Sequence, residues 1–198
     1  VYGQPYATTF QAFGLDNYRR KFPGLDEYYH SGRDTGKQKS PSEYAQDLVE
    51  FMNDLHEQYN NRVFYIFLDP SAKGLAEEVR RATRTGMDYK VILRDAENDV
   101  ALGISRVQKA LTFDIMSISP KQENAIDEFG TYEYDKKSIE KGKEVPVKER
   151  DHGMDAIRYV VMGAWSKLKH WLPAETGEKE ETDYCDISKK EVTDDEYI

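Results

Sequence analysis

Two spacings of apolar residues alternate along this chain. Segments in which apolar residues recur every three or four positions predict helices, because such positions share one face of a helix. These segments are residues 40–59, 74–84, 98–111, 121–135 and 151–169. Short runs rich in β-branched and aromatic residues predict strands instead. These runs are residues 6–15, 25–32, 62–70, 89–95 and 113–119.

Three details of this pattern make sharper predictions. Ser42 is a plausible N-cap for the helix at 40–59. The continuous apolar run at 62–70 predicts a strand that is buried on both faces. The helix at 151–169 carries a broad apolar stripe made of Met154, Ile157, Val161, Ala164, Trp165 and Leu168.

The order of these elements indicates a fold class. Strands come first, and helices and strands then alternate, with a loop or hairpin at 137–150 before the last helix. That order predicts an α/β domain of three layers with a mixed sheet between helices.

Composition limits the classes of protein to which this chain can belong. A chain of 198 residues with 38% hydrophobic residues is long enough for one domain with a core. No apolar run approaches the roughly 20 residues that a membrane span needs, so we expect no membrane contact. The single cysteine, Cys185, excludes an intrachain disulfide and fits a reducing compartment. Since the chain begins at Val1, we expect a piece of a longer protein.

The charge is unevenly distributed. The formal net charge is −9, but much of the acid lies in residues 174–198, which are polar and show no helical or strand period. We therefore expect a domain at residues 1–173 and a disordered acidic tail at 174–198. Basic clusters at 18–22, 32–40 and 78–84 leave a nucleic-acid substrate possible.

Asp69, His152 and Asp155 are the candidate chemical residues. Asp69 ends the strand at 62–70, where functional groups gather in open α/β sheets. His152 and Asp155 lie three residues apart at a helix start, so they share a face. Together they could hold Mg²⁺ or Mn²⁺. The structural alternatives are an Asx-type turn at Asp69, a surface histidine and a first-turn acid beside the cap Asp151.

The segment "GRDTGKQKS" at 32–40 is a basic loop. Its two glycines are separated by three residues and Gln38 follows Lys37, so it does not match a phosphate loop. It is either a solvated charge cluster or a contact to the DNA backbone. The candidate DNA-binding residues, here and in the helix at 74–84, are Arg33, Lys37, Lys39, Arg80, Arg81 and Arg84.

Several motifs, in order, resemble the C-terminal nuclease domain of the large terminase subunit of tailed phages. They are "DEYYHSGRDTGKQKSPSEYA", "FLDPSAKGLAEEVR", "NDVALGISRVQKAL", "KQENAIDEFGTYEYD" and "DHGMDAIRYVVMGAW", and the resemblance covers roughly residues 1–168. It implies a ribonuclease-H-like, integrase-like fold and an endonuclease that uses one or two Mg²⁺ or Mn²⁺ ions. Such an enzyme cuts concatemeric double-stranded viral DNA, with low sequence specificity, to start and end genome packaging.

The resemblance also implies roles for particular residues. Asp69 and Asp155 correspond to two of the three metal-binding acids of the family, and His152 lies where a histidine can approach the metal. The remaining acid precedes a glycine on the first strand of the family. Because Gly3 would match that glycine, the acid falls at Val1 or just before it. The acid is therefore either replaced in this chain or outside the given sequence.

Partners follow from the same resemblance. It implies an upstream ATPase domain in the same polypeptide, a portal, a small terminase subunit, and a place in the host cytoplasm and transiently on the viral procapsid. A competing hypothesis is a non-catalytic module that guides DNA or docks within the packaging motor. A third is an ATP-binding protein of the actin or sugar-kinase type, suggested by "YGQPYATTF" at 2–10.

Overall fold

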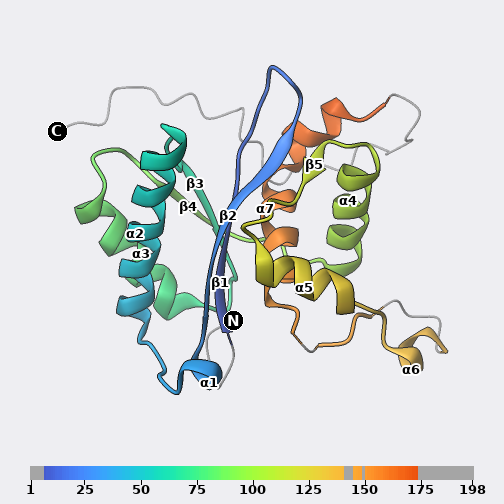
Figure 1. Cartoon of the computed structure of the whole chain (residues 1–198), viewed down its shortest axis with the longest axis horizontal. Coiled ribbons are helices and arrows are strands. Elements are labelled where there is room, and N and C mark those ends of the chain that lie inside the picture. The colour runs from blue at the N-terminus through green and yellow to red at the C-terminus, as the bar shows by residue number, and fades with distance from the viewer. Residues whose placement is uncertain (1–6, 141–144, 149, 174–198) are drawn as a thin grey trace.

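The computed structural model describes residues 7–140, 145–148 and 150–173 (Figure 1). The predicted acidic tail at 174–198 lies outside the described residues, as do residues 1–6. The strands are β1 (Ala7–Phe13), β2 (Phe22–Ser31), β3 (Tyr65–Leu68), β4 (Ile92–Asp95) and β5 (Met116–Ser117). The helices are α1 (Gly32–Thr35), α2 (Pro41–Tyr59), α3 (Lys73–Gly86), α4 (Val100–Thr112), α5 (Glu123–Thr131), α6 (Lys136–Ile139), α7 (His152–Leu168) and the 3-10 helix η1 (Lys169–Trp171).

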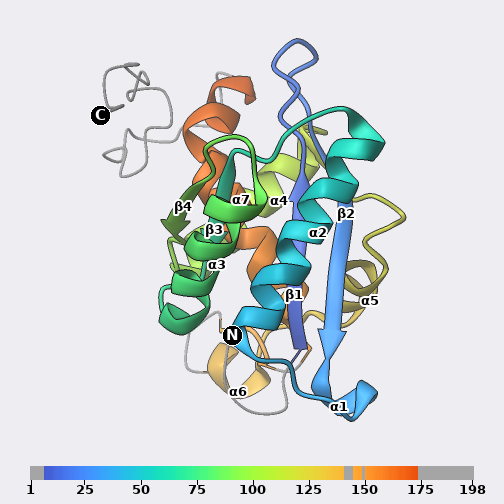
Figure 2. The ribbon, with the colours of Figure 1, turned by 90° about the vertical axis from the view of Figure 1, so that its left-hand side faces the viewer.

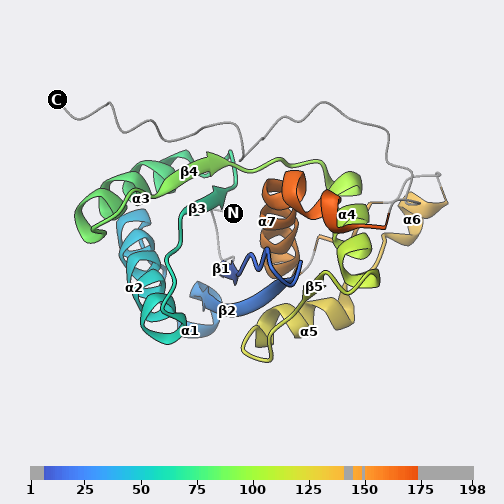
Figure 3. The same ribbon diagram turned by 90° about the horizontal axis from the view of Figure 1, so that it is seen from above.

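The strands of the middle layer form two ladders. β2 pairs antiparallel with β1 and parallel with β5, while β3 pairs parallel with β4. Seen from above, α2 and α3 cover one side of the strands, and α4, α5 and α7 lie on the other (Figure 3). This confirms the predicted three-layer α/β arrangement with strands of mixed direction.

A separate hydrophobic core fills each side of the strand layer. On the side of α2 and α3, Tyr44, Met52 and Val79 are almost fully buried, and partly buried strand residues such as Phe10 and Leu68 pack against them. On the other side, α7 supplies half of the buried core residues, and these are the members of the predicted stripe. Because α7 is buried along most of its length, its first turn is fixed firmly relative to β1 and β3.

Two predicted helix caps are corrected. The N-cap of α2 is Ser40 and not Ser42: its hydroxyl accepts from the Glu43 backbone N–H, and the Glu43 carboxylate accepts from the Ser40 N–H. Pro41 then fits the first helical position, where no N–H is needed. At α7, Asp151 occupies the N-cap position, but its side chain makes no capping hydrogen bond.

The cap of α7 comes instead from a distant residue. Glu128 in α5 accepts hydrogen bonds from the backbone N–H groups of Gly153 (2.7 Å) and Met154 (3.2 Å). Glu128 is only 3% exposed, so its carboxylate replaces water at a buried helix end. In the same way, Glu27 in β2 accepts from the backbone of Asn124 (2.6 Å) at the start of α5.

The strand at 62–70 differs from the prediction in burial. The regular part, β3, is four residues long, and all four are partly exposed. Both faces of β3 do meet helices, but its edge away from β4 pairs with no strand among the described residues. The apolar side chains of this run therefore pack against helices on both faces of β3, while the unpaired edge of β3 leaves its residues partly exposed.

The segment at 137–150 is partly described. The prediction here was a loop or a hairpin. Tyr134 and Pro146 form an isolated antiparallel bridge, and the short helix α6, which was not predicted, lies between them. Residues 141–144 and 149 lie outside the described part. Among the helices that the structure describes, none has the length and apolar character needed to cross a membrane.

Candidate functional site

Asp69 is held at the end of β3 by hydrogen bonds to both of its carboxylate oxygens. Residues 65, 67 and 69 point to one side because side chains alternate along a strand, and this side faces α7. One Asp69 oxygen accepts from the Ser71 N–H (2.7 Å), and the other accepts from the Tyr159 hydroxyl (2.9 Å). The Asx-type turn that the sequence offered as an alternative is therefore present, and the second oxygen still turns toward α7.

The first two turns of α7 carry the other candidates. The prediction that His152 and Asp155 share a face is confirmed, since both line the same cavity as Asp69. Asp155 pairs with Arg158, whose side chain is only 4% exposed. Two nitrogens of Arg158, Nε and Nη1, have no hydrogen-bond partner in the described part of the chain. The Asp155 carboxylate therefore pairs with the buried Arg158 guanidinium, and this ion pair fixes the orientation of the Asp155 side chain.

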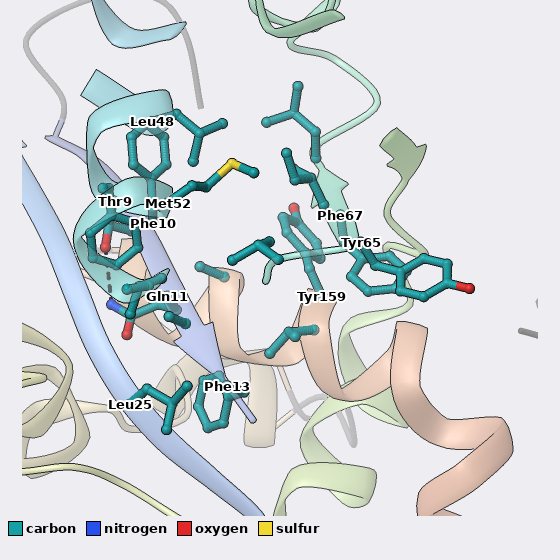
Figure 4. Close-up of a pocket in the computed structure, with 18 of the residues that line it drawn as sticks. Thr9, Phe10, Gln11, Phe13, Leu25, Leu48, Met52, Tyr65, Phe67 and Tyr159 are labelled. Atoms are coloured by element: carbon teal, nitrogen blue, oxygen red, sulfur yellow. Dashed lines mark hydrogen bonds between the residues drawn. The ribbon is translucent and has the colours of Figure 1, made fainter. Parts of the chain in front are cut away.

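The cavity that unites these residues lies between β1, β3, α2 and α7 and has a volume of about 430 Å³ (Figure 4). Most of its wall is apolar, with Leu48 and Met52 from α2 and Phe67 from β3. The Tyr159 ring also lies in this wall (Figure 4). Asp69, His152 and Asp155 are polar exceptions in the lining.

Burial and hydrogen bonds set the protonation of this region. Burial acts to raise the pKa of Asp69, but the hydrogen bonds from Ser71 and Tyr159 outweigh it and hold the pKa below its usual value. Burial lowers the pKa of His152, which favours the neutral imidazole. Burial, followed by the charge of Asp155, raises the pKa of Asp151. Near neutral pH, therefore, Asp69 is ionised and His152 is uncharged, which are the forms that bind metal ions.

The residues fit a divalent cation in kind but do not form a complete set of ligands. Two carboxylates and an imidazole suit Mg²⁺ or Mn²⁺. However, within residues 7–140, 145–148 and 150–173, no three His, Cys, Asp or Glu side chains converge as a metal-binding group. Asp69 and Asp155 lie on opposite walls of the cavity, and each would supply one carboxylate to an ion. The described residues bring no third acid to complete a metal-binding group with them.

None of the six predicted DNA-binding residues lines this cavity. Arg33 and Lys37 are exposed near α1, but Lys39 is half-buried and pairs with Asp47 (2.6 Å) beneath the Tyr28 ring. In α3, Arg80 and Arg81 are exposed and pair with Glu77 and Glu78, respectively, one turn earlier, and Arg84 is exposed. The structure thus places these six residues in two groups, and Lys39 has a structural role.

Sequence reasoning missed the residues that support the site. Tyr159 lies four positions after Asp155, and its hydroxyl also lies 3.4 Å from Asn98 Oδ1. The spacing of Tyr159 from Asp155 could have placed both on one helix face. Arg158 and Glu128 had no such signal, because a buried arginine and a distant cap become visible only once α4, α5 and α7 are packed together.

Comparisons with known proteins agree with this fold. No protein-family model matches the chain, and no curated protein does. Among solved structures, the large terminase of a thermophilic bacteriophage in complex with ADP matches at 32% sequence identity and a TM-score of 0.70, over 81% of this chain and 37% of that chain. The complex of the same terminase with ATP-gamma-S matches with the same identity, TM-score and share of this chain, over 38% of that chain.

The match is to one part of a longer protein, since this chain spans well under half the length of the solved terminases. The three-layer fold with strands of mixed direction is shared with that part, as expected for a ribonuclease-H-like domain. By fold and by 32% identity over four fifths of its length, the chain belongs to the large terminase subunits of bacteriophages.

Proposed function

We propose that this chain is the nuclease domain of a DNA-packaging protein, a divalent-metal-dependent endonuclease that cuts concatemeric double-stranded viral DNA to start and end packaging. One observation carries the proposal. Asp69 at the end of a strand and His152 and Asp155 at the start of a helix line the same cavity, although they are more than 80 positions apart in the sequence. Carboxylates and an imidazole that share one cavity, supplied by two elements, are groups that a metal-dependent hydrolase uses.

Each residue has a proposed role. Asp69 and Asp155 hold one or two Mg²⁺ or Mn²⁺ ions, and His152 is a further ligand or orients the attacking water. When bound, the ion activates water and stabilises charge on the phosphate. Arg158 and Tyr159 are positioning residues: Arg158 fixes Asp155, and the Tyr159 hydroxyl fixes one oxygen of Asp69.

The proposed partners are those of a packaging motor. We propose an ATPase domain in the same polypeptide, a portal and a small terminase subunit, with the work done in the host cytoplasm and on the procapsid. The exposed cations, Arg33, Lys37, Arg80, Arg81 and Arg84, are candidates for contact with the DNA backbone. Contacts of this kind weaken as salt rises.

The test is cleavage of supercoiled plasmid by the intact large subunit that carries this chain. We expect nicking and linearisation with Mn²⁺ and with Mg²⁺, and none with a chelator. DNA binding without cleavage in either metal, from protein shown to be folded, would overturn the proposal. That result would support the non-catalytic DNA-guiding module, which the incomplete ligand set in the described residues favours.

Replacing Tyr159 with phenylalanine should slow cleavage on the order of tenfold, because a hydrogen bond to a charged group is lost. The pKa of Asp69 should rise, so the acidic limb of the pH–rate profile should move to higher pH. The matched control is Tyr65→Phe, since the Tyr65 hydroxyl points away from the cavity (Figure 4). Equal losses in both variants would assign Tyr159 a packing role only.

A further inference from the structure

One cation lies on the strands beside the candidate site. Arg94 is the only lysine or arginine in β3 and β4, and in the parallel ladder it pairs with Phe67. Residues that pair in register on neighbouring strands place their side chains on the same face. Phe67 faces α7, since its ring fills the space beside Gly163, and Asp69 faces the same way. Arg94 and Asp69 therefore lie on one side of the strand layer, the side of α7.

Strand geometry gives the separation of these two residues. Neighbouring strands lie about 4.8 Å apart, and a strand rises about 3.3 Å per residue. Asp69 is two residues beyond Phe67, so its Cα atom lies about 8 Å from that of Arg94. The Ala96 N–H donates to the Leu68 carbonyl at 2.8 Å, which keeps the two chains at this spacing up to Asp69. A string of phosphates that has one member at Asp69 and runs back along the strands therefore passes Arg94.

The Arg94 guanidinium is held in place, but its charge is not neutralised. Its Cζ atom lies 5.4 Å from the centre of the Tyr65 ring, and the side chain is partly exposed. Tyr65→Phe keeps this contact, because the ring makes it and not the hydroxyl. In the described part of the chain, no acid pairs with Arg94 and no acceptor takes a hydrogen bond from it. Its N–H donors are therefore available to a ligand that carries negative charge.

Arg62 is a similar arginine in a different setting. Its Cζ atom lies 4.8 Å from the centre of the Tyr89 ring, so it makes the same kind of contact as Arg94. Arg62 also pairs with Asp88 at 3.1 Å, and it precedes β3, at the end away from Asp69 (Figure 2). The arginine far from the candidate site is thus paired with an acid, whereas the arginine next to the site is not. This difference favours a ligand at Arg94.

The charge of the candidate site calls for such a cation. Asp69 is ionised, and Asp95, which follows Arg94, is exposed. A metal ion neutralises the phosphate that it contacts, but the next phosphates of a DNA strand still lie within about 8–10 Å of these acids, where salt screens charges only partly. Arg80 and Arg81 do not offset this repulsion, because they belong to α3, on the side of the strand layer away from α7 (Figure 3). Arg94 lies on the side where it is needed.

We propose that Arg94 binds a backbone phosphate of the DNA in the candidate site. This phosphate lies about two nucleotides from the one at Asp69, since each DNA strand rises about 3.4 Å per nucleotide. An arginine donates two parallel N–H bonds to a phosphate, and the Tyr65 ring fixes the orientation of the guanidinium beforehand. The contact is with the DNA backbone, so it adds no preference for sequence. This inference rests on the proposed function, because it places DNA at Asp69.

The test is DNA binding by the intact large subunit in Ca²⁺, which takes oxygen ligands as Mg²⁺ does but in a looser geometry. Arg94→Gln should weaken the binding of duplex DNA about threefold to tenfold. It should also reduce the slope of log affinity against log salt by about 0.9, the value for one phosphate contact. Arg94→Lys should restore that slope, since lysine binds phosphate as a point charge. Arg62→Gln, the matched control, removes the same charge from a similar ring contact and should leave the slope unchanged.

Cleavage in Mg²⁺ supplies a second readout. Arg94→Gln should raise KM for plasmid DNA by the same factor and change kcat by less than about twofold. If Arg94→Gln keeps the salt slope, or if Arg94→Lys binds no better than Arg94→Gln, Arg94 supports the fold and holds no phosphate, and the proposal is wrong. If no protein cleaves DNA but Arg94→Gln alone loses one contact, the phosphate contact stands and the nuclease does not. If all cleave and Arg94→Gln binds as Arg62→Gln does, the nuclease stands and this inference fails.

Discussion

Replacing Asp69 with asparagine should lower metal-dependent DNA cleavage at least about 100-fold, while the melting temperature changes by only a few degrees. Asparagine has the same shape and can still accept the hydrogen bond from the Ser71 N–H. It lacks the negative charge that a divalent ion requires. Since changes around metal ligands already cost about 10- to 100-fold, losing a ligand charge should cost at least the upper part of that range.

The chain offers a closely matched control in Asp95. This residue ends β4 as Asp69 follows the end of β3, and it pairs in register with Leu68. Asp95 is exposed and is absent from the lining of the cavity. Asp95→Asn therefore changes the same net charge at the same edge of the strands, and it should leave cleavage within about twofold of the unmodified protein, since it touches no ligand. Full activity in Asp69→Asn, or an equal loss in both variants, would remove Asp69 from the site.

Asp69 is a better test than Asp155 for a physical reason. Asp155 is the partner of Arg158, a guanidinium that is almost fully buried. Removing one member of a buried ion pair leaves the other charge unpaired, which costs about 3–5 kcal/mol in fully buried cases. Asp155 is partly exposed, so the cost should be smaller, but a loss of activity in Asp155→Asn would still combine chemistry with stability.

The features of the site that could be predicted are those that depend on local periodicity. The spacing of His152 and Asp155 places them on one face in any helix, and Asp69 follows an apolar run that predicts a strand. These two facts, with the topology of an α/β domain, are enough to bring the three side chains to one edge. The predicted elements accordingly match the observed ones to within a few residues.

The features that could not be predicted depend on contacts between distant segments. A charged residue in a strand or helix has the same sequence signature whether it is solvated or buried. Lys39 was a candidate for DNA contact, but it is held by Asp47, and Glu128, which no sequence pattern singled out, caps α7. The partial exposure of β3 has a similar origin, since its open edge depends on which strand lies beside it.

Two acids, the buried Glu128 and the half-buried Glu27, link the sheet to the candidate site. Glu27 of β2 accepts from the first turn of α5, and Glu128 of α5 accepts from the first turn of α7. Each acid satisfies N–H groups that a buried helix start would otherwise leave without partners. The position of His152 and Asp155 relative to the strands is therefore set partly through α5. The pKa of Glu128 matters for that reason.

Burial raises the pKa of Glu128 to about 7, against the opposing effect of its bonds to the Gly153 and Met154 N–H groups. The folded protein therefore holds a proton that the unfolded chain, with a usual glutamate pKa near 4.5, releases. Between these two pKa values the folded state binds more protons, so the contribution of Glu128 to stability falls as pH rises. It is fully present below about pH 4.5 and is lost as pH passes through about 7.

Glu128→Gln and Glu128→Ala should separate these effects. Glutamine stays neutral and its carbonyl can accept from Gly153 and Met154, so this variant should match the unmodified protein near pH 5. At pH 8 it should be more stable by up to about 3 kcal/mol, since each unit of pKa shift is worth about 1.4 kcal/mol. Alanine leaves two buried N–H groups without a partner and should cost about 2–3 kcal/mol near pH 5, with a smaller cost at pH 8.

The measurement is urea unfolding of the three proteins, followed by circular dichroism, from pH 4.5 to pH 8. Comparing variants at each pH cancels the titrating groups that do not interact with Glu128, while Asp151 and Glu27, which lie close enough to act on it, contribute to the difference. A difference between the glutamine variant and the unmodified protein that stays constant with pH would show that Glu128 binds protons equally in the folded and unfolded states, and hence that burial does not raise its pKa. A rising difference would show that burying the ionised Glu128 carboxylate destabilises the folded state, although the Gly153 and Met154 N–H groups favour that form, and that the folded state is most stable in mild acid.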